Sequence, residues 1–309
     1  MINVKNLTKF YGNKLAVDNI SFEVKKGEIV GLLGPNAAGK TTIMRILTGY
    51  LAPTMGDAFI AGYNMSTHSL EGRRHIGYLP EIIPLYNDMT VSSYLRFLTK
   101  LRGYPPPKIK SKVNDVIGIC DLKEYANVYI NKLSKGFRQR VGIAQAIVHE
   151  PDVLILDEPT AGIDPIQITS TRQLIKKLGS EHTIILSSHI LPEVSTVCER
   201  VIIIHSGKII AKDKIENLSS MLVDSKQIRI EVKGPPKQVL ACLKEVKGVR
   251  RVAHEGDSIY IIEYPANSDV RSKINKATIK AGFALLGLEV VTMNLEDIFL
   301  KLTNEEPTK

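Results

Sequence analysis

The strongest chemical signal in the sequence is a glycine-rich segment that ends in a lysine and two threonines. Gly34–Thr41 reads G-P-N-A-A-G-K-T and fits the pattern G-x-x-x-x-G-K-[S/T], with an apolar run before it and a helical pattern after it. Backbone N–H groups in such a turn can surround an anion, and the following helix adds the positive end of its dipole. We therefore predict a nucleotide-phosphate site formed by Gly34, Pro35, Asn36, Ala37, Ala38, Gly39, Lys40, Thr41 and Thr42.

Within this loop two side chains have predicted contacts of their own. Lys40 would reach the β- and γ-phosphates of a nucleotide, and the Thr41 hydroxyl would bind Mg²⁺.

Two carboxylates follow a second apolar run. Val153–Leu156 has the composition of a buried strand, and Asp157 and Glu158 come directly after it, at the end where α/β sheets bind their ligands. Asp157 would hold Mg²⁺, directly or through water, and Glu158 would act as a general base on the attacking water. The alternative, a strand followed by a helix-capping acid, is disfavoured beside a phosphate-binding loop.

These residues require a parallel sheet to hold them. From Asp152 to about Ile210 expected strands alternate with expected helices, which indicates a parallel sheet covered on both faces, an α/β fold. The strands are Val153–Leu156, Thr183–Leu186 and Val201–Ile204, and the helices are Ile166–Leu178 and Leu191–Cys198.

The remainder of the first domain, residues 1–218, contains two further kinds of structure. The first thirty residues alternate apolar and polar positions, which predicts short antiparallel strands, followed by a buried strand over Glu28–Leu33 and a helix over Thr41–Tyr50. A helical subdomain is expected over about 87–150, interrupted by an inter-helix loop at Tyr104–Pro107.

A second, smaller domain is expected after a linker at 219–226. Residues 227–309 show a β-α-β-β-α-β order, which predicts a small ferredoxin-like α+β domain. A short helix over Leu295–Leu302 is expected to follow the last strand.

The composition limits the class of protein without choosing a function. The chain has 309 residues, 41 Lys plus Arg against 32 Asp plus Glu, and no Trp. The basic residues are not interleaved with aromatics. An ordinary solvated surface is therefore the favoured explanation of the excess positive charge, proximity to a membrane comes second, and nucleic-acid binding is disfavoured. No apolar run approaches the roughly 20 residues of a membrane-spanning helix.

A third motif separates the families that share the first two. Leu133–Val141 reads L-S-K-G-F-R-Q-R-V and ends 16 residues before Asp157. It resembles the L-S-G-G-Q-x-Q-R signature of ABC ATPases, and by itself it is a helix capped by Ser134. Ala161–Pro165 resembles the D-loop of that family, His189 its switch histidine, and Tyr11 the aromatic that stacks on adenine.

The likeness reaches the C-terminal residues. Met293–Leu302 is similar to a tail in the subgroup paired with ABC-2-type export permeases, which includes gliding-motility-type and multidrug-type ATPase subunits. Four positions depart from the family pattern. Glu81 stands where the Q-loop glutamine is usual, Lys135 and Phe137 replace Gly and Gln of the signature, and Ala37 replaces a common Gly at a position that the general phosphate-loop pattern leaves free. Glu81 is kept as a candidate contact to Mg²⁺.

The resemblance implies an ATPase that works as a head-to-tail pair, with ATP and Mg²⁺ as cofactors. Each ATP would lie between the phosphate-binding loop of one subunit and the signature residues Ser134 and Gly136 of its partner. Glu158 and His189 would be the catalytic residues, and Asp164 would bridge the two subunits. The expected partners are a second, identical ATPase subunit and integral-membrane permease subunits, with no nucleic acid. The chain would be cytoplasmic, peripheral on the inner face of the cell membrane, and would drive export.

Two alternatives from other classes stay open. One is a non-transport ABC ATPase that acts on a ribosome, DNA or another membrane complex, and the other is a module that binds ATP without hydrolysing it.

Overall fold

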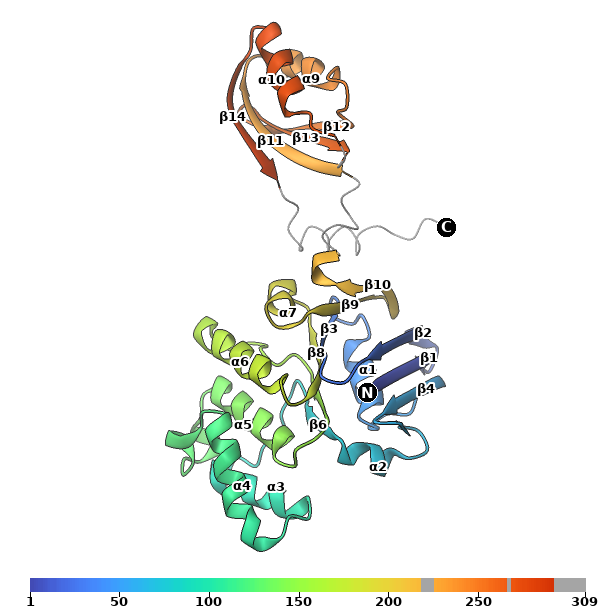
Figure 1. The fold of residues 1–309 in the computed structure, drawn as a ribbon, viewed down its shortest axis with the longest axis vertical. Coiled ribbons are helices and arrows are strands. Elements are labelled where there is room, and N and C mark those ends of the chain that lie inside the picture. Colours follow the sequence, from blue (N-terminus) through green and yellow to red (C-terminus); the bar gives the residue numbers. More distant parts are fainter. Residues whose placement is uncertain (218–224, 266–267, 292–309) are drawn as a thin grey trace. The chain divides into compact units, whose positions relative to one another are not determined.

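The computed structural model describes residues 1–217, 225–265 and 268–291 (Figure 1). The chain forms two compact units, Met1–Ile215 and Glu216–Lys309. The expected linker at 219–226 and the expected helix Leu295–Leu302 fall largely or wholly outside the described residues. Within the described part of the chain every helix is too short or too polar to cross a bilayer.

A four-stranded antiparallel sheet opens the first unit. Its order is β2-β1-β4-β5, and it consists of β1 (Ile2–Tyr11), β2 (Lys14–Val24), β4 (Met55–Ile60) and β5 (Tyr63–Asn64). The prediction of short strands in the first thirty residues was wrong in length. β1 and β2 have 10 and 11 residues, because bulges between Val4 and Phe10 shift the register and let one pairing continue.

A six-stranded sheet of order β10-β9-β3-β8-β7-β6 carries the site. β9 (Arg200–His205), β3 (Ile29–Leu33), β8 (Thr183–Ser188), β7 (Val153–Leu156) and β6 (Ile76–Leu79) are parallel, and β10 (Lys208–Lys214) pairs antiparallel at the edge. The central strands are buried at every position of β7 and β8, as their continuous apolar sequences predict.

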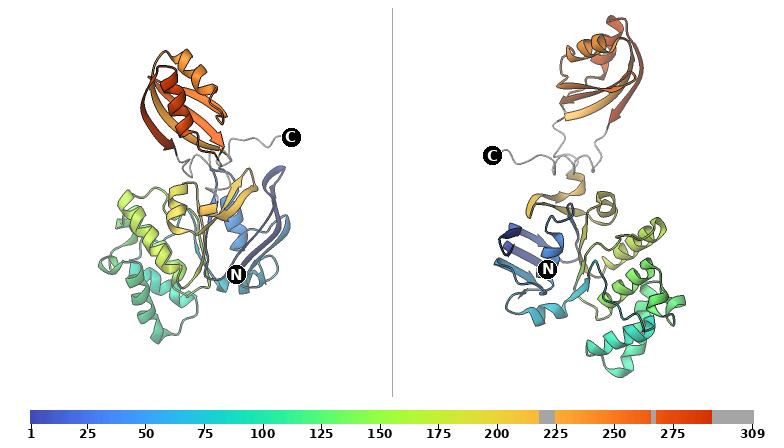
Figure 2. Two further views of the ribbon diagram at one scale, coloured as in Figure 1. Left: turned by 45° about the horizontal axis from the view of Figure 1, so that its top comes forward. Right: turned by 180° about the vertical axis from the view of Figure 1, so that it is seen from behind.

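Helices cover both faces of this sheet. α1 (Lys40–Leu47) lies between the two sheets, and its Ile43, Met44, Ile46 and Leu47 belong to a core shared with both. On the other face lie α5 (Lys135–Ile147), α6 (Pro165–Leu178) and α7 (Leu191–Val197), as Figures 1 and 2 show. α2 (Ser69–Arg74) precedes β6.

The segment 87–150 is helical in its described residues. α3 (Val91–Leu101), α4 (Pro106–Ile119) and α5 pack on one another, with 3₁₀ turns at Lys123–Tyr125 and Ile130–Lys132. The prediction of a loop over Tyr104–Pro107 was wrong at its end, because Pro106 and Pro107 form the first turn of α4. A proline is tolerated there, since its missing N–H would have no partner inside the helix.

The second unit has the expected element order. β11 (Ser225–Lys233), α9 (Pro236–Lys244), β12 (Arg251–Gly256), β13 (Ile259–Pro265), α10 (Arg271–Lys280) and β14 (Ala284–Val291) give an antiparallel sheet of order β12-β13-β11-β14. Apolar residues of β11 and β13 form a separate core with α9 and α10. The name ferredoxin-like for this unit, and the domain boundaries given above, stay predictions.

Candidate active site

The phosphate-binding loop joins β3 to α1, as the sequence predicts. Gly34 and Gly39 are both required by the local backbone. A Cβ at Gly34 would lie 2.3 Å from the carbonyl oxygen of Ile204, and Gly39 has φ +111° as the residue that caps α1. The Gly34 N–H donates to the Ser188 carbonyl at 3.3 Å, which fixes the start of the loop to the end of β8.

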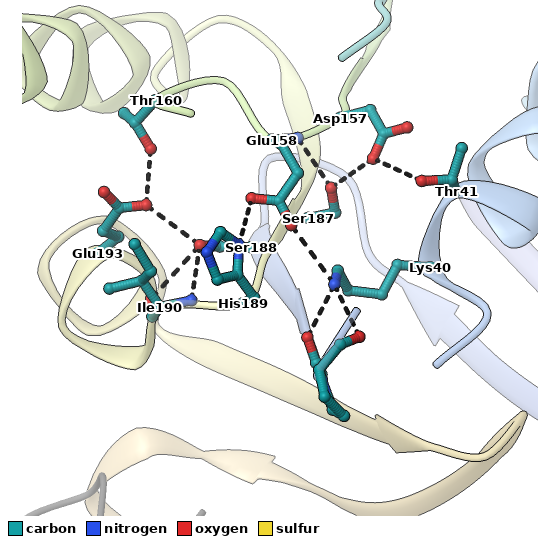
Figure 3. Close-up of polar contacts among 12 residues, drawn as sticks. Lys40, Thr41, Asp157, Glu158, Thr160, Ser187, Ser188, His189, Ile190 and Glu193 are labelled. Carbon is teal, nitrogen blue, oxygen red and sulfur yellow. Dashed lines mark hydrogen bonds and ion pairs between the residues drawn. The ribbon is translucent and has the colours of Figure 1, made fainter. Parts of the chain in front are cut away.

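Lys40 is buried, with 6% of its surface exposed, and its ammonium is held on three sides. It donates to the carbonyl oxygens of Gly34 at 2.7 Å and Pro35 at 3.2 Å, and its Nζ lies 3.4 Å from Glu158 Oε1. Charge-assisted contacts of this kind offset the cost of burying an ammonium group. The side chain therefore lies fixed between the loop and the predicted general base (Figure 3).

Glu158 is a buried carboxylate in a strained backbone position. Its φ is +49°, in the left-handed region that few residues other than glycine occupy, and the Ala161 N–H closes the turn by donating to the Glu158 carbonyl at 3.1 Å. Its Oε2 lies 2.9 Å from His189 Nδ1, and its own N–H donates to Ser187 Oγ at 2.9 Å. Strain at a residue that carries a candidate catalytic group is typical of active sites.

Asp157 is the most buried of the candidate acidic residues. Ser187 Oγ donates to its Oδ1 at 2.6 Å, Thr41 Oγ1 lies 3.5 Å from the same atom, and Oδ2 is buried with no hydrogen-bond partner in the described structure. Burial raises the pKa of Asp157, the hydrogen bonds from Ser187 and Thr41 oppose this shift, and the charges of Glu81 and Glu158 add to it. A cation beside Oδ2 would stabilise the ionised carboxylate.

A cavity of about 810 Å³ collects most of the predicted residues. It is lined by Tyr11, Asn36, Ala37, Ala38, Gly39, Lys40, Thr41, Thr42, Glu81, Glu158 and His189, together with Lys14, Leu15, Ala16, Ala161, Ser206 and Gly207. Tyr11 lies at the end of β1 and is 45% exposed, so one ring face can receive a ligand. Six separate regions of the sequence (11–16, 36–42, 81, 158–161, 189 and 206–207) therefore meet at one cavity.

The predicted signature residues lie elsewhere. Ser134 and Gly136, and Asp164 of the segment that resembles the D-loop, are all described, and none of them lines the cavity. Gly34, Pro35 and Asp157 do not line it either, but their chain neighbours Asn36 and Glu158 do. Ser134 caps α5, where its Oγ accepts from Phe137 N–H at 3.4 Å, and Asp164 caps α6 by accepting from Gln167 N–H at 3.0 Å. The structure thus brings together one group of predicted residues and separates the other from it.

The signature departures have visible local consequences. The Phe137 ring packs on Tyr125, with ring centroids 3.9 Å apart, and the Lys135 ammonium lies beside Gly162, where a Cβ would be only 2.2 Å from it. Gln167 of α6 covers the start of α5 and donates to Ser134 Oγ at 3.4 Å. These contacts tie α5 to the segment that contains Asp164 within one chain.

Sequence reasoning missed several polar residues around the site. Ser187 joins Asp157 to the Glu158 backbone, and a buried cluster of Thr160, Ser188 and Glu193 lies behind Glu158 and His189. The one sequence signal for Ser187 and Ser188 is their place at the carboxyl end of a predicted strand. Glu193 has no signal beyond its place in the first turn of a helix.

The oxygen atoms near Thr41 fit a hard divalent cation. Thr41 Oγ1, the unpartnered Asp157 Oδ2 and the Glu81 carboxylate at the cavity wall are ligands of the class that Mg²⁺ prefers.

Comparisons with known proteins point to one family. The family model described as ABC transporter matches residues 17–161. The bacitracin transport ATP-binding protein BcrA of Bacillus licheniformis is 34% identical over 304 residues, which cover 98% of this chain and 97% of that protein. The linearmycin resistance ATP-binding protein LnrL of Bacillus subtilis (strain 168) is 33% identical over 305 residues, 98% of each chain.

Among solved structures, a dimeric post-hydrolysis state of an ATP-binding cassette bound to ADP and Pi matches with a TM-score of 0.64. It is 25% identical and covers 70% of this chain and 99% of that one. The fold, the phosphate-binding loop and near full-length similarity lead to one conclusion: the chain belongs to the family of ABC transporter ATP-binding proteins and is an ATP-hydrolysing subunit.

Proposed function

We propose that two copies of this chain hydrolyse MgATP in composite sites and drive export through a separate membrane permease. The observation that carries the proposal is the arrangement at the cavity. The phosphate-binding loop, Glu158 and His189 lie together there, whereas Ser134 and Gly136 lie outside it. One chain thus brings only half of the residues that the family uses to its own cavity, and Ser134 and Gly136 of a second copy would complete the site.

Glu158 is the general base in this proposal. The carboxylate lies 3.4 Å from Lys40 and 2.9 Å from His189, at the wall of the cavity that would receive the terminal phosphate. Nδ1 of His189 carries the proton in the tautomer that donates to Glu158, and this contact would orient the carboxylate toward the attacking water. Lys40 would hold the β- and γ-phosphates from the loop side.

Mg²⁺ would be held by Thr41 and Asp157, with Glu81 as a further candidate. When bound, the ion would neutralise charge on the phosphates and favour the ionised form of Asp157, whose pKa burial raises. Glu81 brings an extra negative charge where the family usually has a neutral glutamine. We therefore assign Glu81 to the cavity wall and treat its metal contact as secondary.

The second copy would present the start of α5 to the nucleotide. Ser134 and the N–H groups after it are a helix N-terminus, which favours negative charge, and the nearby Lys135 adds a cation. Asp164, close to this end of α5 through Gln167, would bridge the two copies. Binding of ATP would close the pair and hydrolysis would reopen it.

The transport direction is inferred from the relatives. Their names refer to bacitracin transport and linearmycin resistance, and resistance to a compound is consistent with its removal from the cell. The permease would be a separate chain that places this subunit at the inner face of the cell membrane. The loop at Glu81 and the helical segment 87–150 would transmit the closing motion to it.

The experiment that tests this assignment is affinity purification of tagged, ATP-loaded Glu158→Gln protein from gently solubilised native membranes, followed by mass spectrometry. We expect a multi-span membrane protein in stoichiometric amount. Ribosomal proteins or DNA-bound complexes with no membrane partner would contradict the transport function and leave only the ATPase chemistry.

A further inference from the structure

A buried carboxylate lies behind the active site. Glu193 of α7 is only 7% exposed and does not line the cavity. Its Oε2 accepts hydrogen bonds from Thr160 Oγ1 at 2.6 Å and Ser188 Oγ at 3.1 Å, and its Oε1 lies 3.5 Å from Arg172 Nη2. Figure 3 shows Glu193 between the segment that follows Glu158 and the segment that carries His189.

The contact to Thr160 fixes the turn that contains the predicted base. Thr160 lies two residues after Glu158, inside the turn closed by Ala161 N–H on the Glu158 carbonyl. Glu158 itself has φ +49°. A residue keeps such a conformation only where its surroundings hold it. The 2.6 Å hydrogen bond from Thr160 is a short, buried anchor close to the strained position.

The contact to Ser188 fixes the other loop. Ser188 Oγ donates to Glu193 and at the same time accepts from Ile190 N–H at 3.0 Å. The Ser188 hydroxyl therefore links the residue before His189 to Ile190, the residue after it. His189 has a side chain that is 42% exposed, so its placement depends on this backbone more than on packing.

We propose that Glu193 is a positioning residue for ATP hydrolysis, which holds Glu158 and His189 in their 2.9 Å contact by anchoring both of their loops. This inference rests on the proposed role of Glu158 as the base. The carboxylate suits the position because one oxygen accepts two hydroxyl protons and the other faces a guanidinium. A glutamine would have to point its NH₂ group at a donor on one of the two sides.

The first test is steady-state ATPase kinetics of the full-length Glu193→Gln variant. We expect kcat to fall by about tenfold to a hundredfold, the loss that small misplacements in active sites produce. KM for ATP should change little, because the polar partners of the Glu193 side chain among the described residues are Thr160, Ser188 and Arg172, none of which belongs to the phosphate-binding loop.

The matched control is Glu28→Gln. Glu28 is also an ion-paired carboxylate, with Arg200 Nε at 2.6 Å from its Oε1, but it lies before β3, away from the phosphate-binding end of the sheet. We expect it to keep kcat. A Glu193→Gln variant that loses no more kcat than Glu28→Gln, or whose KM rises as much as its kcat falls, would overturn the proposal.

Two smaller substitutions test the same network should Glu193→Gln fail to fold. Thr160→Val and Ser188→Ala each remove one hydroxyl group. We expect each to lower kcat at unchanged KM, with or without a folded Glu193→Gln. Where Glu193→Gln does fold, its combination with Thr160→Val should lose less than the product of the single losses, because both substitutions disturb the same hydrogen bond. Full additivity, or wild-type kcat in both hydroxyl variants, would contradict the proposal.

The Glu158→Gln variant separates this inference from the function on which it rests. Normal turnover in Glu158→Gln would remove the proposed base. Loss of turnover in Glu158→Gln together with normal turnover in the Glu193 and hydroxyl variants would reject the positioning role alone.

Discussion

Two parts of the proposed site are built differently. The cradle is the phosphate-binding loop with Lys40 together with Asp157 and Glu158, and the signature is the start of α5 with Ser134 and Gly136. At the cradle the charged groups are buried and contacts are short, such as Lys40 to Gly34 at 2.7 Å and Ser187 to Asp157 at 2.6 Å. At the signature the Ser134 hydroxyl is exposed, and its contacts to Phe137 and Gln167 are both 3.4 Å long.

This difference indicates which half is complete within one chain. Short, buried contacts pre-organise the cradle, so that little rearrangement is needed when phosphate arrives. At the start of α5 Ser134 and Lys135 are exposed and Gly136 is covered by Gln167, and the first N–H groups of a helix have no partner inside it. We infer that α5 presents this end to a partner.

The largest effect is expected at the cradle. Glu158→Gln should reduce kcat by about 10²- to 10⁴-fold, the range of general-base contributions, because the amide cannot take a proton from water. Binding of ATP should persist, since Lys40 keeps its two carbonyl contacts. Phosphate release and nucleotide binding, measured on the same preparation, check both statements. Undiminished turnover would remove Glu158 from the role of base.

An intermediate effect is expected at the signature. Gly136→Ala should lower kcat by about tenfold, since a methyl group would obstruct the partner's phosphate within a closely fitted site. The same methyl would meet Gln167 Oε1, 1.2 Å from the ideal Cβ position.

The Gly136→Ala, Gln167→Ala double variant separates the two causes. If the double variant stays slow, the methyl acts on the partner's nucleotide as we propose. If the double variant recovers wild-type turnover, the effect was a clash within one chain, and the signature role of Gly136 would be wrong.

The smallest effect concerns stability and its dependence on pH. Burial raises the pKa of Asp157, so the ionised carboxylate destabilises the fold in full above the raised pKa, and this cost shrinks as pH falls through the raised value and is gone below the ordinary carboxyl pKa. Asp157→Asn should therefore raise the Tm of nucleotide-free protein at neutral pH. The difference in Tm between the variant and the wild type should become smaller as the pH is lowered. Thermal unfolding at several pH values checks this. A lower Tm at neutral pH would show that the Ser187 hydrogen bond outweighs desolvation.

The parts of the site that the sequence could predict are those that are contiguous in the chain. The loop Gly34–Thr41 with the strand before it and the pair Asp157 and Glu158 with theirs each combine a strand, a turn and charged residues within thirteen positions, so local rules were enough. The placement of the loop and Glu158 at one cavity follows from the parallel order of β3, β7 and β8.

The supporting residues could not be predicted because they act across long separations. Glu193 meets Thr160 over 33 residues, and Ser187 meets Asp157 over 30. Serine, threonine and glutamate are common at helix starts and surfaces, so nothing local distinguishes these copies. β4 was missed for another reason: its first half, with Gly56 and Asp57, has low strand propensity, and pairing with β1 overrides it.

The most direct test of the composite site mixes two inactive variants. Lys40→Ala disables the cradle, and Ser134→Glu places a negative charge where the partner's phosphate would bind while keeping an acid at the start of α5. If each site takes its halves from two identical subunits, an equal mixture should recover about a quarter of wild-type ATPase activity, since half of the dimers have one intact site. Activity that stays at the level of either variant alone, at every mixing ratio, would contradict a site shared between two copies.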